Sequence, residues 1–217
     1  LATLEKDTTK NREEGLLEVY RKLRPGEPPT VESATSQINM LFFDPHRYDL
    51  SRFGRYKMNK KLSLARRITG QVAAENVVAP LTGEILIEAG AKITREMAEK
   101  ADNAGVNLVV LKIEDSLKEE AKKVKVITNG CVDAQGFFSF DVKECGINER
   151  CSFDEIKKIL DTTSDVEEQK EMLRRNHDQL IGRTVTVADI LSSINYLNGL
   201  GHGIGTTDDI DHLGNRR

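Results

Sequence analysis

TGEILIEAGAKITREMAEKADNAGV, residues 82–106, places a short β-rich run directly before a well-marked helix. The apolar run ILI is followed three residues later by Gly90, and glycine after a β-rich run is typical of a short strand with a tight turn. Thr94 can cap the helix that follows, and Gly105 lies just past its end. The stretch therefore predicts a fold that mixes strands and helices.

Other short β-rich runs surround this stretch: ITGQVAAENVV, VNLVVLKI, KVKVIT and GFFSFDV. Together they predict a compact β-barrel or sandwich at about 68–140, with one helix tucked between strands. Two charged helices are expected at about 152–182. The second carries Ser164 and Glu167 in the spacing of a capping box, and it is expected to stop at Gly182.

Both ends of the chain have the pattern of helices instead. Helices are expected at 11–23, around 38–42 and at 49–62, and LRPGEPPT (23–30) predicts a rigid connector between the first two. A last helix at 184–201 carries an apolar stripe made of Ile190, Leu191, Ile194, Leu197 and Leu200. Helical ends around a different middle are typical of a host fold with an inserted domain, because domain termini often lie close together.

The composition limits the classes of function. The 217 residues carry a formal net charge of −3, so any role with nucleic acid must rest on local patches. No apolar run is long enough to span a membrane, and no signal peptide is recognisable. The three cysteines match no zinc pattern and are expected to be reduced thiols. Both ends look cut from a longer chain.

A run of cations between residues 52 and 67 contains no acid and is interleaved with Phe53 and Tyr56. Such cations can neutralise phosphates, and nearby aromatic rings can stack on bases. A solvated basic helix face, with both aromatic rings in the core, is the alternative. The cations are Arg52, Arg55, Lys57, Lys60, Lys61, Arg66 and Arg67.

The terminal stretch TTDDIDHLGNRR, 206–217, gathers Asp208, Asp209, Asp211 and His212 behind a glycine-rich approach. A metal site would need carboxylates from several chain segments, and paired-carboxylate hydrolysis would need them held across a substrate. A carboxylate can also accept from the exocyclic amine of a base. The residues alone do not decide among a metal site, a hydrolytic site, a base-binding site and a surface loop with no such role. No nucleotide-binding loop or hydrolase motif indicates catalysis.

Three segments together resemble bacterial DNA-directed RNA polymerase β subunits: LRPGEPPT at 23–30, FFDPHRYDLSRFGRYKMNKKL at 42–62 and DDIDHLGNRR at 208–217. The resemblance implies an internal piece of a much longer subunit, from the lobe and fork beside the DNA channel. The host part would be 1–65 and 184–217. In many of these subunits the GRYKMNKKL-like segment is followed within a few dozen residues by DDIDHLGNRR, so residues 66–183 would be a lineage-specific insertion. Its TGEILIEAGAKITREMAEKADNAGV resembles the β-β′ module, a sandwich-barrel hybrid motif.

The resemblance thus implies an α+β fold in which helical lobe-type segments carry a small β-rich domain. It also implies a nucleotidyltransferase whose partners are DNA, the rest of β, β′ and σ, in the bacterial cytoplasm. The fragment alone is expected to be inactive and to hold no cofactor, since the Mg²⁺ of the complete enzyme is held by another subunit. The insertion 66–183 could instead dock a regulatory protein, or be a spacer.

Site residues carry over only where the sequence matches. In these subunits the DDIDHLGNRR segment helps to form a pocket for the non-template strand. The resemblance therefore implies that Asp211 accepts hydrogen bonds from a flipped guanine and that Arg216 supports the pocket. The full set of expected DNA-contacting residues is Ile210, Asp211, Arg216, Arg52, Arg55, Lys57 and Lys60.

Overall fold

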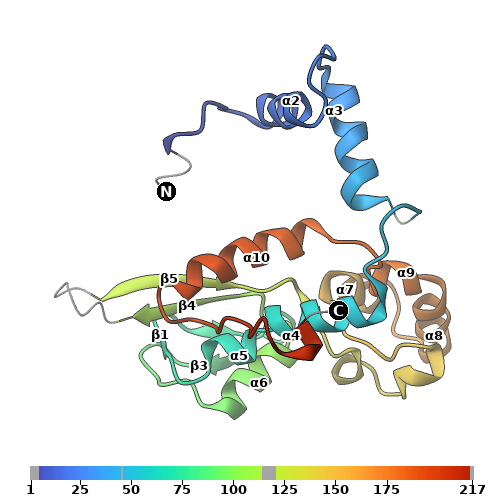
Figure 1. Ribbon diagram of the computed structural model, residues 1–217. Coiled ribbons are helices and arrows are strands. Elements are labelled where there is room, and N and C mark those ends of the chain that lie inside the picture. The colour runs from blue at the N-terminus through green and yellow to red at the C-terminus, as the bar shows by residue number, and fades with distance from the viewer. Residues whose placement is uncertain (1–4, 45, 114–120, 216–217) are drawn as a thin grey trace. The chain divides into compact units, whose positions relative to one another are not determined.

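The computed structural model describes residues 5–44, 46–113 and 121–215, and it divides the chain into two compact units. Unit 1 is Leu1–Leu50 and unit 2 is Ser51–Arg217. The fold is α+β, as expected, and both units are drawn in Figure 1. The division falls at position 50. The host and insertion boundaries predicted from sequence, 65/66 and 183/184, both lie inside unit 2.

Unit 1 is helical. It contains α2 (Arg12–Leu23), α3 (Val31–Ile38) and the π-helical turn η1 (Asn39–Phe43). The connector at 24–30 turns at Gly26, whose φ is +97°, a value that side chains rarely adopt. Glu27 fixes the connector, because its carboxylate accepts from Tyr20 Oη at 2.7 Å and from Arg24 Nη1 at 3.2 Å. LRPGEPPT is therefore an interhelical connector with Arg24 and Glu27 held in place.

Unit 2 opens with α4 (Ser51–Leu62) and α5 (Leu64–Ile68), and the strands among its described residues form three small antiparallel sheets. The largest has the order β1-β4-β5, from Val72–Ala73, Leu108–Ile113 and Lys122–Ile127. β2 (Val77–Val78) pairs with β3 (Ile85–Ile87), and β6 (Cys131–Val132) pairs with β7 (Cys151–Ser152). The predicted helix is α6 (Arg95–Asn103), capped by the Thr94 side chain as expected.

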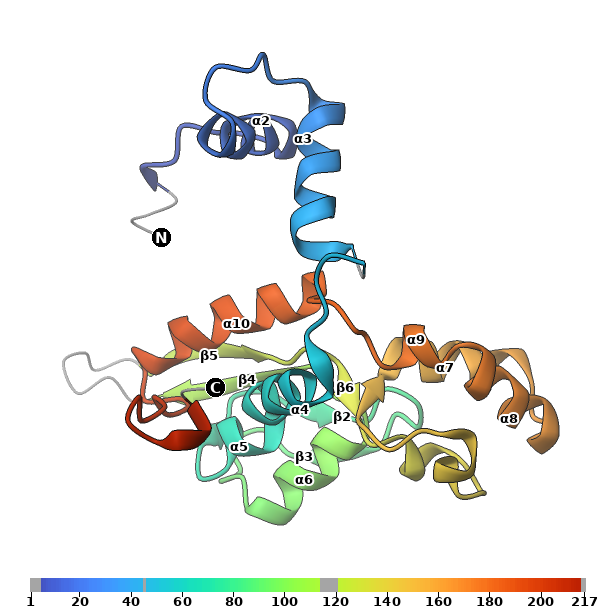
Figure 2. The same cartoon turned by 45° about the vertical axis from the view of Figure 1, so that its right-hand side comes forward.

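Two hydrophobic cores stabilise unit 2. The first packs α5 and α6 against the sheets, around Leu64, Ile68, Ile87 and Leu111. The second lies among α7 (Phe153–Thr162), α8 (Val166–Arg175) and α9 (His177–Leu180), around Ile156 and Leu173. Figure 2 shows these three helices grouped at one end of the unit, with α10 (Val187–Leu200) running beside β5.

Two local predictions were wrong. GFFSFDV does not form a strand: its residues lie in the 3-10 turn η2 (Ala134–Phe137) and in the approach to η3 (Val142–Cys145). Asp133 and Asp141 begin these turns with side-chain hydrogen bonds to the backbone, which compete with strand pairing. The predicted capping box of α8 is also absent, because Asp165, and not Ser164, accepts from the Glu168 amide. That helix ends at Arg175, and the separate turn α9 follows it.

The apolar stripe of α10 faces outward. Asp189, Ser192, Tyr196 and Gly199 are the buried residues of this helix, whereas Leu191 and Leu197 are exposed by 56% and 68%. The physical reason is that α10 packs on the edge of a sheet. Asn195 accepts from the Ile127 amide at 2.9 Å and donates to the Lys125 carbonyl at 2.8 Å, so a polar side chain satisfies the open edge of β5.

Candidate nucleic-acid interface

One face of α4 carries cations and aromatic rings into solvent. Helix positions 52, 53, 56, 57 and 60 are exposed, whereas Arg55, Asn59 and Leu62 are buried. Lys57 Nζ lies 5.4 Å from the centroid of the Phe53 ring, and Lys60 Nζ lies 5.6 Å from that of Tyr56. Each pair is arranged for a cation–π interaction, which keeps the ring beside a positive charge. We call this set, Arg52, Phe53, Tyr56, Lys57 and Lys60, the α4 face.

Arg55, expected from sequence among the DNA contacts, does not belong to the α4 face. Its side chain is buried in an ion pair: Nη1 lies 3.0 and 2.8 Å from the two carboxylate oxygens of Asp189. Nε donates to the Gly182 carbonyl at 2.8 Å, and Nη2 donates to the Thr184 carbonyl. With its donors occupied inside the protein, Arg55 positions α4 and offers nothing to a phosphate.

Asp189 is the centre of this buried polar cluster. It accepts from Asn129 Nδ2 at 2.8 Å, and Asn129 Nδ2 also donates to Asn59 Oδ1 on α4 at 2.9 Å. Burial alone would raise the pKa of the Asp189 carboxyl, but hydrogen bonds from Asn129, Thr186 and Arg55 outweigh it and lower the pKa. The carboxylate is therefore ionised at neutral pH, as the buried guanidinium requires.

Arg52 and Lys57 differ in whether a carboxylate is paired with their positive charge. Arg52 Nε lies 2.5 Å from Glu149 Oε1, although 80% of the arginine side chain is exposed. The arginine end of this pair is open to solvent, whereas the Glu149 side chain is only 15% exposed, so a phosphate can compete for the arginine. Within the part of the chain that the structure describes, Lys57 and Lys60 form no ion pair with a carboxylate. The α4 face thus presents cations that an anionic ligand can reach.

The terminal segment is attached to α4 through Lys61. Lys61 Nζ donates to the Thr206 carbonyl and to Asp208 Oδ1, both at 2.7 Å. Desolvation lowers the pKa of this ammonium, but its interactions with Asp208 and Tyr196 outweigh that effect and raise the pKa. Tyr196 Oη donates to the Thr206 carbonyl at 2.7 Å and accepts from the Thr206 amide at 2.8 Å. Helices α4 and α10 therefore both hold the start of this segment.

Beyond Thr206 the segment turns at the surface. Ile210 is 80% exposed, and the Asp211 amide donates to Asp209 Oδ1 at 2.9 Å. The short 3-10 helix η4 (Leu213–Asn215) follows, and Arg216 lies outside the described residues. The structure thus places Ile210 and Asp211 on an exposed turn that Lys61 joins to α4.

The same contacts bear on the hypothesis that the aspartates of the terminal stretch bind a metal ion. Asp208 is paired with Lys61, and Asp209 accepts from the backbone of its own turn. Over residues 5–44, 46–113 and 121–215, no group of three or more His, Cys, Asp or Glu side chains could hold a metal ion. In the same part of the chain, no helix has the length and apolar character needed to cross a membrane.

Sequence reasoning missed the roles of Tyr196 and Arg67. Arg67 is buried: Nη1 donates to the Ile127 carbonyl and Nη2 to Asn195 Oδ1, both at 2.6 Å. Its guanidinium carbon lies 5.3 Å from the centroid of the Tyr196 ring, and Lys61 Nζ lies 5.2 Å from the same centroid. No local pattern in the sequence marks these contacts, because the partners of Arg67 are more than 50 residues away.

Comparison with known proteins identifies the class to which this arrangement belongs. Residues 1–76 and 110–217 match the family described as RNA polymerase Rpb2, domain 2, and the chain belongs to that family. The family match passes over residues 77–109, a segment inside the predicted insertion 66–183.

Individual relatives are β subunits of DNA-directed RNA polymerase. The one from Alkaliphilus metalliredigens is 54% identical over 217 residues, and those from Acetivibrio thermocellus and Clostridioides difficile are 52% and 50% identical. Each alignment covers 100% of this chain but 17% of the relative, so the chain spans about a sixth of their length. The resemblance seen in the three sequence segments is thereby confirmed.

Proposed function

We propose that this chain lines the DNA channel of RNA polymerase and contacts the non-template strand through the α4 face and the 206–215 turn. The observation that carries this proposal is the Lys61 link. Lys61 joins α4 to Thr206 and Asp208, which brings two segments from distant parts of the sequence onto adjacent surfaces. Cations, aromatic rings and an exposed carboxyl-bearing turn then lie together in unit 2.

Each part of this surface has a chemical task in the proposal. Lys57 and Lys60 neutralise backbone phosphates, and Arg52 does so when it leaves Glu149. Phe53 and Tyr56 offer exposed rings on which an unpaired base stacks. Asp211 accepts from the Watson–Crick edge of an extruded guanine beside Ile210, with Arg216 as the supporting residue.

The activity of the whole enzyme is part of the proposal. The complete β subunit would work with β′ and σ in nucleotidyl transfer onto RNA, in the cytoplasm. This chain would supply positioning and no catalytic group, and Mg²⁺ would be held by another subunit. We also propose that residues 66–183 form an inserted β-rich module of the sandwich-barrel hybrid kind. A regulatory protein docked on that module is the alternative role for it.

The test uses the whole polymerase reconstituted with Asp211→Ala in β. Open-complex lifetime is measured on two promoters that differ only in whether the downstream non-template base is guanine. We expect the lifetime advantage of guanine to disappear in the variant, because the acceptor for its edge is gone. Asp178→Ala, an exposed carboxylate on α9, is the matched control. An unchanged guanine preference in Asp211→Ala would remove the base-reading role from this turn.

Lys57→Glu tests the α4 face separately. Loss of one phosphate contact should weaken DNA binding about equally on all sequences and reduce the slope of log K against log salt by about one. The charge-matched control is Lys157→Glu, since Lys157 is exposed on α7 and lies outside the α4 face. Equal salt slopes in the two variants would argue against DNA contact by this face.

A further inference from the structure

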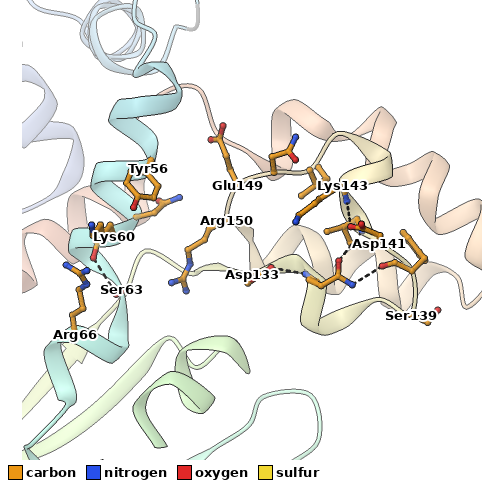
Figure 3. A pocket seen from close by; sticks show the side chains of 16 residues that line it. Tyr56, Lys60, Ser63, Arg66, Asp133, Ser139, Asp141, Lys143, Glu149 and Arg150 are labelled. Carbon is orange, nitrogen blue, oxygen red and sulfur yellow. Dashed lines mark hydrogen bonds between the residues drawn. The ribbon is translucent and has the colours of Figure 1, made fainter. Parts of the chain in front are cut away.

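A cavity of about 920 Å³ lies in unit 2 between α4–α5 and the segment 133–150. Figure 3 shows Tyr56, Lys60 and Arg66 on the helical side, opposite Glu149, Arg150 and Lys143. The volume is far larger than a single phosphate needs and falls in the range of small-molecule sites. Its walls come from both predicted parts of the chain, since α4 belongs to the expected host and 133–150 to the expected insertion.

The cavity lining carries four cations, Lys60, Arg66, Lys143 and Arg150, and three carboxylates, Asp133, Asp141 and Glu149. Its acids are already engaged: Asp133 and Asp141 accept from backbone amides at 3.0 Å, and Glu149 accepts from Arg52. Three of its cations have no carboxylate partner among the described residues, namely Lys60, Arg66 and Lys143. Cations that converge on one hollow without partners favour an anionic ligand.

Arg150 adds a fixed donor. Nε donates to the Cys131 carbonyl at 3.0 Å and Nη1 donates to Asp102 Oδ2 at 2.8 Å, so the guanidinium is held from two sides. The third nitrogen, Nη2, is buried and has no hydrogen-bond partner among the residues that the structure describes. In Figure 3 this side chain extends from its own segment toward the α4–α5 side of the cavity. An unpaired buried donor costs free energy, which an acceptor on a ligand would recover.

A ligand with acceptors alone would leave one group unsatisfied. Glu149 Oε2 is also buried, with no hydrogen-bond partner in the described part of the chain, and it can only accept while it is ionised. The ligand should therefore carry donors as well as anionic oxygens. Two aromatic rings line the same space, Tyr56 and Phe140, and Phe140 packs against Phe138 with their centroids 5.3 Å apart. Rings at the wall of a cationic site suit a planar heterocycle.

We infer that this cavity binds a nucleoside phosphate, with the phosphates on Lys60, Arg66, Lys143 and Arg150 and the base against Tyr56 or Phe140. A sugar hydroxyl or an exocyclic amine supplies the donor for Glu149. The nucleoside phosphate is either a free nucleotide or one unit of a single DNA strand. The cavity shares Tyr56 and Lys60 with the α4 face, whereas Lys143, Arg66 and Arg150 have no part in the proposed function.

The experiment titrates the 217-residue chain with two fluorescent probes, methylanthraniloyl-ATP and a labelled oligothymidine of about ten nucleotides. Fluorescence anisotropy gives Kd for the wild type and for Lys143→Glu, Arg66→Glu and Lys157→Glu. The first two substitutions reverse exposed cations of the cavity, and Lys157 is an exposed cation outside it. Circular dichroism confirms that each variant is folded, and two cavity variants guard against the failure of one.

We expect at least one probe to bind, with Kd raised about ten-fold or more by each cavity variant and less than about two-fold by Lys157→Glu. Tighter binding of the ATP probe identifies a free nucleotide, and tighter binding of the oligonucleotide identifies a strand. Absence of saturable binding by both probes, or equal weakening by Lys157→Glu, overturns the inference.

Lys57→Glu separates this inference from the proposed function, because Lys57 lies on the α4 face but not in the cavity. Oligonucleotide binding that falls with Lys57→Glu and not with Lys143→Glu supports the α4 face and overturns the cavity. Binding that falls with Lys143→Glu and not with Lys57→Glu supports the cavity alone.

Discussion

Arg55 and Asp189 are 134 positions apart in the sequence, yet their ion pair holds α4 in place. The sequence showed Arg55 only as one cation of a basic run, because its partner lies in a helix whose pattern is dominated by apolar residues. Helical periodicity places positions 55, 59 and 62 on one face of the helix, but it does not show whether that face is buried. The distinction between a buried arginine and an exposed lysine therefore needed the tertiary structure.

We expect Arg55→Ala to lower the free energy of unfolding by about 3–5 kcal/mol, because it leaves the Asp189 carboxylate buried without its cation. Urea denaturation followed by circular dichroism measures the change. Arg52→Ala is the control, since its exposed pair with Glu149 should contribute about 1 kcal/mol or less. Equal effects of the two substitutions would contradict the buried pair.

Acid should weaken the same pair. The pKa of Asp189 is lower in the folded chain than the ordinary value of 3.8 for an aspartate. A depressed carboxyl pKa stabilises the fold at pH values above the unfolded value, and that stabilisation is lost as the pH falls through the folded value. In Asp189→Asn this acid-dependent part of the unfolding free energy should be missing, which urea titrations at several acidic pH values would show.

Two cysteines should resist alkylation. Burial raises the pKa of Cys131 to about 11 and that of Cys151 to about 12, and the thiolate is the reactive form. Iodoacetamide at pH 8, followed by mass spectrometry, should modify both thiols much faster in urea than in buffer. Because the folded pKa values are raised above 9.0, stability should also fall as the pH rises through them. Rapid labelling of Cys151 in the folded chain would contradict its burial.

At the scale of elements, sequence predicted those that carry their own local signals. α6 begins after Thr94 as expected, and α7 follows Ser152 at its predicted place. The prediction of a strand at GFFSFDV was wrong because Asp133, just before it, and Asp141, near its end, accept hydrogen bonds from nearby amides. The orientation of α10 could not be predicted either, because it depends on the carbonyl and amide of β5 that Asn195 satisfies.

α10 offers a direct comparison of its two faces. Leu197→Gln should change the unfolding free energy by about 0.5 kcal/mol or less, because the leucine is exposed. Asn195→Leu should cost about 1–3 kcal/mol, because it leaves the Ile127 amide and the Arg67 guanidinium without their acceptor. Urea denaturation distinguishes the two, and a larger loss in Leu197→Gln would mean that the stripe is buried.

At the scale of the whole molecule, polar contacts join the two cores of unit 2. Arg150, next to β7, pairs with Asp102 on α6, and Asp102 Oδ1 also accepts from the Leu64 amide at 3.0 Å. Leu111→Ala in the first core and Leu173→Ala in the second should therefore lower the midpoint of one shared unfolding transition. Calorimetry showing two transitions, each shifted by one substitution only, would mean that the cores unfold independently.

The segment 77–109, which the family match passes over, leaves and returns at neighbouring points. The Ala74 amide donates to the Val110 carbonyl at 2.8 Å, so a short chain could close the gap. Yet the segment supplies Ile87 and Ile93 to a core that also contains Leu64 and Ile68. A homologue without this segment would expose the side chains at positions 64 and 68 to water. We therefore expect the presence of the segment and the apolar character of positions 64 and 68 to vary together. In an alignment of homologues, polar residues at 64 and 68 should coincide with loss of the segment.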